Sequence, residues 1–265
     1  MSEYQLRTDA FGRKRLDLQG KIYNPASCRF LLEHSIKLGQ SILEIGCGSG
    51  AMTPFLAELT GKKGRVLAID ISESQVKATE KLVKKANLKQ VECKQLSVFD
   101  LDELKEKFDV IYVRWVLIHL QDPFLALEKV IKQLKKGGLL VIDEMLNSYS
   151  FSFPESPVFA KRRYVLEQFF IRNNLDPNFG LQLKSALLKN KLYDIREAFY
   201  QPIVQTKVER QLLTFIFKEV KEKIIELAIL KEKELKQMIE SLEKMAKIKD
   251  NTLAISALYQ ISARK

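Results

Sequence analysis

A short glycine-rich segment constrains the fold of this chain more than any other feature. Residues 43–53 read LEIGCGSGAMT, and Gly46, Gly48 and Gly50 come directly after the apolar run SILEI (41–45). Glycine adopts positive φ angles and lets a ligand approach the backbone closely. A loop of this kind that leads from a strand into a helix offers free N–H groups and a partial positive charge to a nucleotide-like ligand. The segment therefore predicts an α/β chain with a cofactor at the end of its first strand.

The stretches after this loop alternate between short apolar runs and helical patterns. Strands are predicted at RVLAID (65–70), VECKQL (91–96), FDVIYV (108–113) and LLVIDE (139–144), and helices at 51–59, 72–86 and 123–134. Strands that alternate with helices of this length predict a parallel sheet joined by right-handed crossovers.

The segments on either side of this core have a different character. Asn24 is the predicted N-cap and Pro25 the first residue of a helix that ends before Gly39. Aromatic and turn residues in 145–180 predict a helical insertion. Beyond it we expect helices over 181–191 and 210–249, and strands over 194–200 and 251–265.

We expect these segments to form a single domain of 265 residues. Residues 1–40 would form an N-terminal cap and residues 41–144 the cofactor-binding core. Residues 145–180 and 201–250 would form helical segments on the substrate side, and a homodimer could bury part of them.

Cysteine and histidine usage gives no sign of a metal site or of a disulfide framework. Cys28, Cys47 and Cys93 lie far apart, and only His34 and His119 could join them. A structural zinc site needs about four clustered ligands. No stretch reaches 18 uncharged apolar residues and the N-terminus has no apolar signal-like run, so we expect no membrane span and a cytoplasmic location.

The charge balance raises the question of nucleic acid. The chain has 44 basic and 33 acidic residues, a net charge of +11, and such a field attracts phosphates. Between Lys218 and Asp250, however, nine Lys face seven Glu and one Asp, which is typical of a solvated helical face. No RNA-binding module is recognisable. We therefore expect a generally basic surface and no nucleic-acid partner.

The glycine loop by itself leaves the cofactor open. GCGSGA (46–51) satisfies the dinucleotide pattern G-x-G-x-x-G/A. Glu44, two residues before the first glycine, would oppose a pyrophosphate but would suit the ammonium group of an amino-acid moiety. Asp70, at the end of the second strand, can accept hydrogen bonds from both ribose hydroxyls of any adenosine-type cofactor. A phosphate-binding loop of the Walker type is excluded because no Gly-Lys-Ser/Thr follows.

Taken in order, the stretches ILEIGCGSGAMT, VLAIDIS, FDVIYVRWVLIHLQDP and LKKGGLLVIDE resemble the class I S-adenosylmethionine-dependent methyltransferases. Within that class they look closest to the ubiquinone- and menaquinone-biosynthesis-like group of small-molecule methyltransferases. The resemblance covers about residues 20–145. It implies a Rossmann-like, seven-stranded, mostly parallel sheet of order 3-2-1-4-5-7-6. It also implies S-adenosyl-L-methionine as cofactor, S-adenosyl-L-homocysteine as product and a small-molecule acceptor.

The resemblance also implies roles for matching positions in the cofactor site. The methionine end and ribose would be surrounded by Glu44, Gly46, Cys47, Gly48 and Gly50. Asp70 would hold the ribose hydroxyls. The adenine would lie near Ile71, Gln75, Ser97 and Val98, and the backbone of Arg114 would contact the methionine end. One departure concerns Leu96-Ser97, where many relatives have Gly-Asp, so the adenine amino group lacks its usual acid unless Asp100 supplies it.

The candidates for chemistry lie after the fourth strand and in the insertion. Methyl transfer is an in-line displacement in which the protein mainly positions the reactants, and a base is needed only where the nucleophile must lose a proton. His119 in WVLIHLQDP is the candidate base, or else a structural histidine. Trp115, Tyr149 and Phe153 could line a substrate pocket or pack in the core. Tyr4 and Tyr23 could close over the cofactor, whereas Cys47 is interpreted as packing.

Three other functions fit some of the same residues. An RNA or protein methyltransferase would use the same cofactor loop. A non-catalytic S-adenosylmethionine-binding protein would keep the fold without turnover. A nicotinamide-dependent oxidoreductase would use the loop as a dinucleotide site. The sequence does not specify the acceptor or the atom that receives the methyl group.

Overall fold

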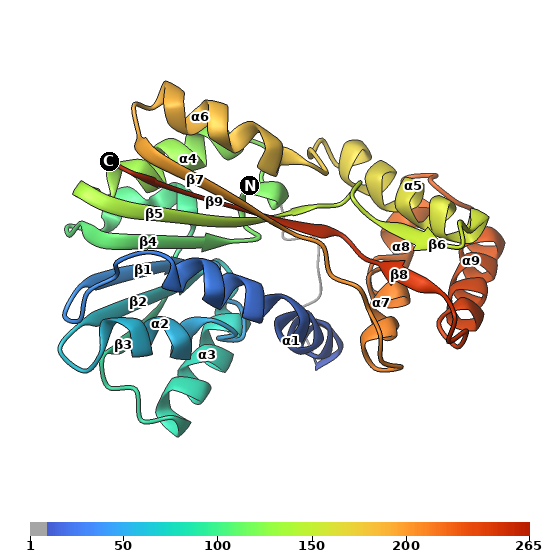
Figure 1. The fold of residues 1–265 in the computed structure, drawn as a ribbon, viewed down its shortest axis with the longest axis horizontal. Helices are drawn as coiled ribbons and strands as arrows, with labels where there is room; N and C mark the ends of the chain where they lie inside the picture. The colour runs from blue at the N-terminus through green and yellow to red at the C-terminus, as the bar shows by residue number, and fades with distance from the viewer. Residues whose placement is uncertain (1–9) are drawn as a thin grey trace.

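A seven-stranded sheet forms the centre of the computed structural model, which describes residues 10–265 (Figure 1). Its strands are β1 (Ser41–Ile45), β2 (Arg65–Asp70), β3 (Val91–Gln95), β4 (Phe108–Arg114), β5 (Leu134–Leu146), β7 (Tyr193–Tyr200) and β9 (Ala257–Arg264). Their order is β3-β2-β1-β4-β5-β9-β7. Ranked along the chain within this sheet, that is the predicted 3-2-1-4-5-7-6. Strand β9 runs antiparallel to both neighbours and the remaining pairs are parallel.

Side chains of the central strands alternate between two hydrophobic layers, as expected for a parallel sheet buried on both faces. In β1, Ile42 packs in one cluster with Phe30 and Leu56. The next residue, Leu43, packs in the other cluster with Leu127. This alternation fixes which residues of a strand face which helices.

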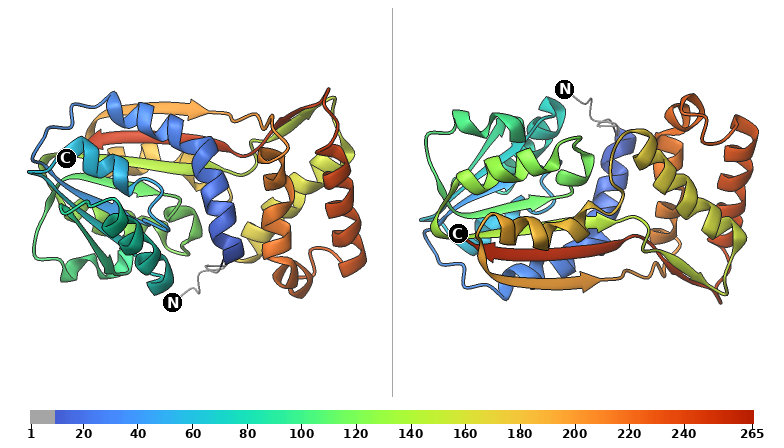
Figure 2. Two further views of the ribbon diagram at one scale, coloured as in Figure 1. Left: turned by 90° about the horizontal axis from the view of Figure 1, so that it is seen from below. Right: turned by 90° about the horizontal axis from the view of Figure 1, so that it is seen from above.

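Helices cover both faces of the sheet (Figures 1 and 2). One face carries α1 (Ala10–Leu32), α2 (Thr53–Thr60) and α3 (Glu73–Lys85), and the other carries α4 (Pro123–Lys132) and α6 (Leu183–Lys189). Short 3₁₀ turns cover Val98–Glu103, Leu117–His119, Phe179–Gln182 and Glu209–Gln211. The predicted helices and strands of residues 41–144 are therefore present, with shifts of a few residues at their ends.

The first helix differs from the prediction. It runs without interruption from Ala10 to Leu32 with Pro25 inside it, so Asn24 is not an N-cap. The Asn24 side chain instead donates to the carbonyl of Ala51, at 2.9 Å, and accepts from Arg114, at 2.6 Å. These two tertiary contacts replace the local cap that the sequence suggested.

A helical lobe extends from one end of the sheet (Figure 2). It consists of α5 (Pro157–Arg172), α7 (Leu212–Glu219), α8 (Lys221–Glu226) and α9 (Glu232–Met245), with a small sheet of β6 (Phe151–Phe153) and β8 (Thr252–Ala254). The predicted helical region 210–249 is thus divided into separate helices, and the predicted strand 251–265 is divided between β8 and β9.

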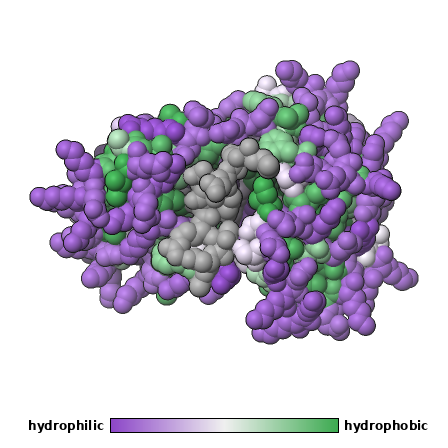
Figure 3. Space-filling view, turned by 180° about the vertical axis from the view of Figure 1, so that it is seen from behind, coloured by the Kyte–Doolittle hydropathy of each residue, from purple (hydrophilic) through white to green (hydrophobic). Residues whose placement is uncertain are grey.

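The charged residues of this lobe form surface pairs. Lys218 contacts Glu243 at 2.5 Å and Lys221 contacts Glu232 at 2.6 Å, with all four side chains substantially exposed. Hydrophilic side chains cover most of the face seen in Figure 3. These pairs match the solvated face predicted from the Lys/Glu balance. Within residues 10–265, no helix is long and apolar enough to cross a membrane.

Candidate active site

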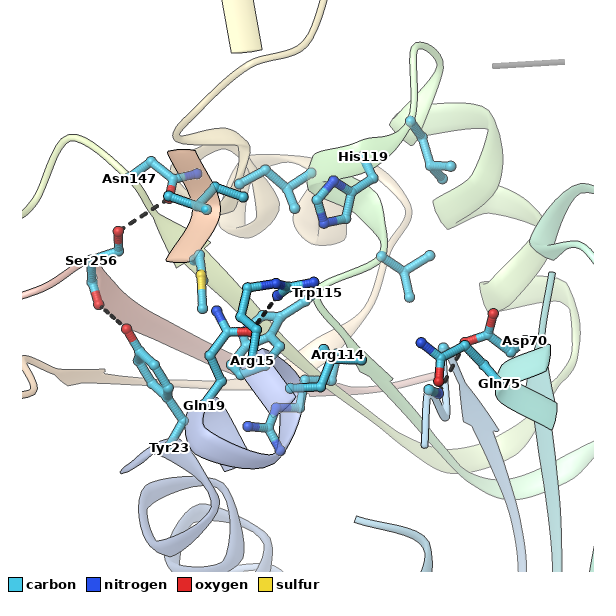
Figure 4. A pocket seen from close by; sticks show the side chains of 18 of the residues that line it. Arg15, Gln19, Tyr23, Asp70, Gln75, Arg114, Trp115, His119, Asn147 and Ser256 are labelled. Atoms are coloured by element: carbon cyan, nitrogen blue, oxygen red, sulfur yellow. Dashed lines mark hydrogen bonds between the residues drawn. The ribbon is translucent and has the colours of Figure 1, made fainter. Parts of the chain in front are cut away.

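A cavity runs along the carboxyl ends of β1, β2 and β4 and continues between the sheet and the helical lobe. In Figure 4, Asp70 and Gln75 lie at one side of the cavity, and Asn147 and Ser256 lie at the opposite side. At one end lie the glycine loop, Asp70 and the turn at Ser97, and at the other lie side chains of α1, α5 and α7. Ligands of open α/β sheets bind at this edge of the sheet.

The glycines of the loop have different structural roles. Gly46 has a φ of +78°, and a Cβ there would lie 2.3 Å from a methyl carbon of Val116, so only glycine fits. Gly48 has a φ of +55°, but a Cβ there would meet no atom of residues 10–265 within 4 Å. Gly46 and Gly48 line the cavity, whereas Gly50 packs against Thr79 and is not part of the wall.

The Asp70 carboxylate joins the end of β2 to the glycine loop. One oxygen accepts from the N–H of Gly48 and the other from the N–H of Ser72, each at 2.9 Å. Burial raises the pKa of Asp70, and these backbone hydrogen bonds oppose the rise. Asp70 lines the cavity, and each of its oxygens has a further lone pair.

Two other predicted loop residues lie outside the cavity wall. The Glu44 carboxylate is buried beneath the loop, where it accepts a hydrogen bond from the hydroxyl of Thr53 at 2.6 Å. Burial raises the pKa of Glu44 to about 8. Cys47 is also buried, and burial raises the pKa of its thiol well above the usual range. The structure therefore places the Glu44 carboxylate against α2, behind the residues that line the cavity.

The residues predicted to lie near adenine are brought together on one side of the cavity, which is lined by Ile71, Gln75, Ser97 and Val98. Gln75 is buried, and its Oε1 has no hydrogen-bond partner within the described part of the chain. The Ser97 hydroxyl accepts from the N–H of Phe99 at 3.1 Å and so caps the following turn. Asp100 is exposed and does not line the cavity.

Arg114 and Trp115 form the wall where β4 ends. The guanidinium of Arg114 lies 4.0 Å from the centre of the Trp115 ring, and its Nε and Nη2 lack hydrogen-bond partners among residues 10–265. Trp115 has a φ of +53°, which is uncommon for a bulky residue and is typical of functional sites. Its ring meets that of Tyr23, whose hydroxyl donates to the carbonyl of Ser256 at 2.7 Å.

His119 lies in the turn that follows, and Figure 4 shows its imidazole in the same space as Arg15 and Trp115. The ring stacks on Phe170 with 6.1 Å between centroids. Burial, helped by the positive charge of Arg15, lowers the pKa of His119 to about 4. The imidazole is therefore neutral at physiological pH.

Sequence reasoning did not identify Glu144, whose carboxylate holds the turn between β4 and His119 by hydrogen bonds. One of its oxygens accepts from the N–H groups of Val116 and Leu117, at 3.1 and 2.8 Å. The side chain is fully buried, which raises the pKa of Glu144 to about 8. The signal that could have drawn attention to it is the acidic pair Asp143-Glu144, which ends the apolar run predicted as a strand over 139–144.

Sequence reasoning also did not identify the polar side chains at the helical end of the cavity. Arg15 on α1 and Arg162 on α5 line it, and both are buried. The aromatic residues predicted for this role, Tyr149 and Phe153, do not line the cavity and are 43% and 71% exposed. Tyr149 packs on Phe199 instead. Tyr4 lies outside the described residues.

A family model described as a methyltransferase domain matches residues 36–198. The chain is 30% identical over 123 residues to ribosomal protein L11 methyltransferase of Campylobacter concisus, an alignment that covers 46% of this chain and 41% of the relative. It is 27% identical over 135 residues to demethylmenaquinone methyltransferase of Bacillus velezensis, covering 51% and 58%. The chain spans between 28% and 58% of the length of the curated relatives it matches.

A solved structure extends the likeness to the fold. Phosphoethanolamine N-methyltransferase 2 of Haemonchus contortus, in complex with phosphomonomethylethanolamine and S-adenosylhomocysteine, has a TM-score of 0.57 with this chain. The sequence identity is 17%, and the match covers 92% of this chain and 53% of that one.

Proposed function

Because the chain belongs to the family of methyltransferase domains that residues 36–198 match, we propose that it transfers a methyl group from S-adenosylmethionine to a small molecule. One observation carries the cofactor assignment. Buried polar atoms without partners among residues 10–265, Oε1 of Gln75 and Nε and Nη2 of Arg114, belong to side chains that flank the glycine loop in the cavity wall. Buried polar groups are ordinarily satisfied, so such atoms favour a polar ligand here.

Each part of the cofactor has a complementary group in this wall. Asp70 would accept from the ribose hydroxyls with the lone pairs left free by Gly48 and Ser72. Gln75 would offer its free oxygen to the adenosine moiety, where Ser97 takes the place of the usual acid. The free N–H groups of Arg114 would bind the carboxylate of the methionine moiety, which assigns a role to its side chain as well as to its backbone.

When bound, the sulfonium of the cofactor supplies an electrophilic methyl group. The protein then has to exclude water and align the acceptor. The helical end of the cavity, next to Trp115, is enclosed enough for both tasks. Its walls include the apolar side chains of Met145, Leu166 and Phe170. His119 would accept a hydrogen bond from the acceptor. As a base it is weak, because the pKa of its imidazole is about 4.

The test uses the full chain with radiolabelled S-adenosylmethionine and a cell extract separated into small-molecule, protein and RNA fractions. We expect label only in the small-molecule fraction, and calorimetry should show binding of S-adenosylhomocysteine but not of NAD. Label in protein or RNA would contradict a small-molecule acceptor. Cofactor binding without any transfer would favour a non-catalytic binding protein.

A further inference from the structure

The helical end of the cavity contains a buried cation that no acidic side chain of the described residues neutralises. Arg162 on α5 is 3% exposed and lines the cavity. Its Nε donates to the carbonyl of Leu213 at 3.3 Å, and its Nη1 has no hydrogen-bond partner among residues 10–265. Within the same range, no Asp or Glu forms an ion pair with it. An uncompensated buried charge is costly, so its presence calls for an explanation.

Two other buried arginines show how the fold satisfies a structural guanidinium. Arg15 is paired with Glu219 at 2.6 Å and donates to Gln19 at 2.5 Å. Arg210 uses all three of its nitrogens, which donate to the carbonyls of Val204, Ala246, Ile248 and Asn251. Among the residues that the structure describes, Arg162 has neither a counter-charge nor such a set of carbonyls.

The immediate surroundings of Arg162 offer little compensation. The rings of Phe159 and Phe217 lie 5.4 and 5.8 Å from its guanidinium carbon, which gives only weak cation–π attraction. An ionised Tyr23 would stabilise the charge of Arg162. The Tyr23 hydroxyl donates to a carbonyl, however, and burial raises the pKa of that phenol, so it stays neutral. The guanidinium itself remains charged, since burial lowers its pKa only to about 10.

The position of Arg162 on α5 relates it to the reacting end of the cavity. Arg162, Leu166 and Phe170 are spaced four residues apart, so they share one helix face, and all three line the cavity. Phe170 stacks on His119. Eight residues of α-helix separate the Cα atoms of Arg162 and Phe170 by roughly 12 Å.

We propose that Arg162 is the anion anchor of the acceptor site, and that the acceptor is a small, elongated, mainly apolar molecule with a carboxylate or phosphate at one end. The anion pairs with Arg162, the apolar body lies along Leu166 and Phe170, and the nucleophilic atom lies near His119. This inference rests on the proposed methyl-transfer function and names its substrate class.

The test compares three probes with the same eight-carbon body: octanoate, octyl phosphate and octan-1-ol. Each is titrated by calorimetry into the full chain saturated with S-adenosylhomocysteine. We expect at least one of the two anions to bind about tenfold or more tightly than the alcohol, the range of a charge-assisted hydrogen bond. The better of the two anions identifies carboxylate or phosphate as the preferred group. The single tryptophan, Trp115, lies in the wall, so its fluorescence reports binding within the cavity.

Substitutions on α5 give the matched control. Arg162→Met should abolish the preference for the anion and leave octan-1-ol binding unchanged. Arg163→Met removes the same charge from the next residue, which bonds to the carbonyl of Ser150 outside the cavity wall, and should keep the preference. If Arg162→Met does not fold, the same titrations with Arg162→Gln test whether the anion preference of the wild type depends on Arg162.

Equal binding of the three probes by wild type, binding of none of them, or a preference that survives in Arg162→Met would each overturn the anion anchor. The proposed function fails separately, if S-adenosylhomocysteine itself does not bind to the wild-type chain.

Discussion

The two ends of the cavity are built in different ways. The glycine-loop end is formed by short continuous segments. Its loop is held by hydrogen bonds from two backbone N–H groups to one carboxylate, that of Asp70. The helical end is assembled from side chains that lie as far apart in the chain as Arg15 and Ser256. Backbone geometry can recognise a ligand shared by many proteins, whereas distant side chains can be exchanged without disturbing the loop. Under the proposed function, the first end binds the cofactor and the second selects the acceptor.

The largest effect should come from a substitution at the loop end. In Gly46→Ala the new Cβ would overlap Val116, and we expect affinity for S-adenosylhomocysteine to fall by about tenfold to hundredfold, since overpacking costs about 1–3 kcal/mol. Gly39→Ala is the matched control, because Gly39 also has a positive φ, +88°, but a Cβ there meets nothing within 4 Å. Calorimetry would measure both, and equal affinities would contradict the steric role of Gly46.

A smaller effect should follow from removing charge at the same end. Asp70→Asn weakens the hydrogen bonds to Gly48 and Ser72 and to a bound ribose, and we expect about a tenfold loss of affinity for S-adenosylhomocysteine. Asp100→Asn removes an exposed carboxylate outside the cavity and should leave the affinity unchanged. A comparable loss in Asp100→Asn would indicate that Asp100 binds the adenine amino group.

The smallest effect concerns acid sensitivity at the helical end. Because the folded-state pKa of His119, about 4, lies below its ordinary value of 6.5, its neutral form adds stability above pH 6.5 that is lost as pH falls toward 4. Between pH 7 and pH 5.5 this amounts to about 1 kcal/mol of unfolding free energy. Urea unfolding should show a shallower decline in His119→Gln than in wild type.

The only other histidine provides the control for this measurement. Burial also lowers the pKa of His34, which lies after α1 and away from the cavity. In His34→Gln, the unfolding free energy should therefore still show the decrease at low pH that His119 causes. If His119→Gln declined as steeply as wild type, the acid-sensitive group would lie elsewhere.

The sequence was sufficient where a site is local. The loop, Asp70 and Gln75 are close along the chain and follow recognisable strand–helix boundaries, so their convergence could be predicted. The contact of the Glu44 side chain with α2 could also have been predicted. Glu44 lies on the same face of the sheet as Ile42, which packs with Leu56 of α2. The alternation of side chains along a strand puts Glu44 and Ile42 on the same face of the sheet.

Other features depended on contacts that no local pattern contains. Asn24 looked like an N-cap, but its partners, Arg114 and Ala51, come from distant parts of the chain. The same is true of Arg162, whose neighbours Leu213 and Tyr23 lie in α7 and α1 and supply no counter-charge within the described chain. Burial and neighbouring charge gave these residues their roles, and both are properties of the folded chain.

The place of β9 between β5 and β7 has a consequence for the order of folding. In the described part of the chain, strand β7 pairs in the sheet only with β9. Ser256, whose carbonyl accepts from the Tyr23 hydroxyl, comes immediately before β9. During synthesis the glycine loop and its neighbouring strands emerge and can pair long before β9 does. The chamber at the helical end closes only after this late, long-range pairing, a slow kind of step in folding. A nascent chain can thus form its glycine loop before the helical end of the cavity is complete.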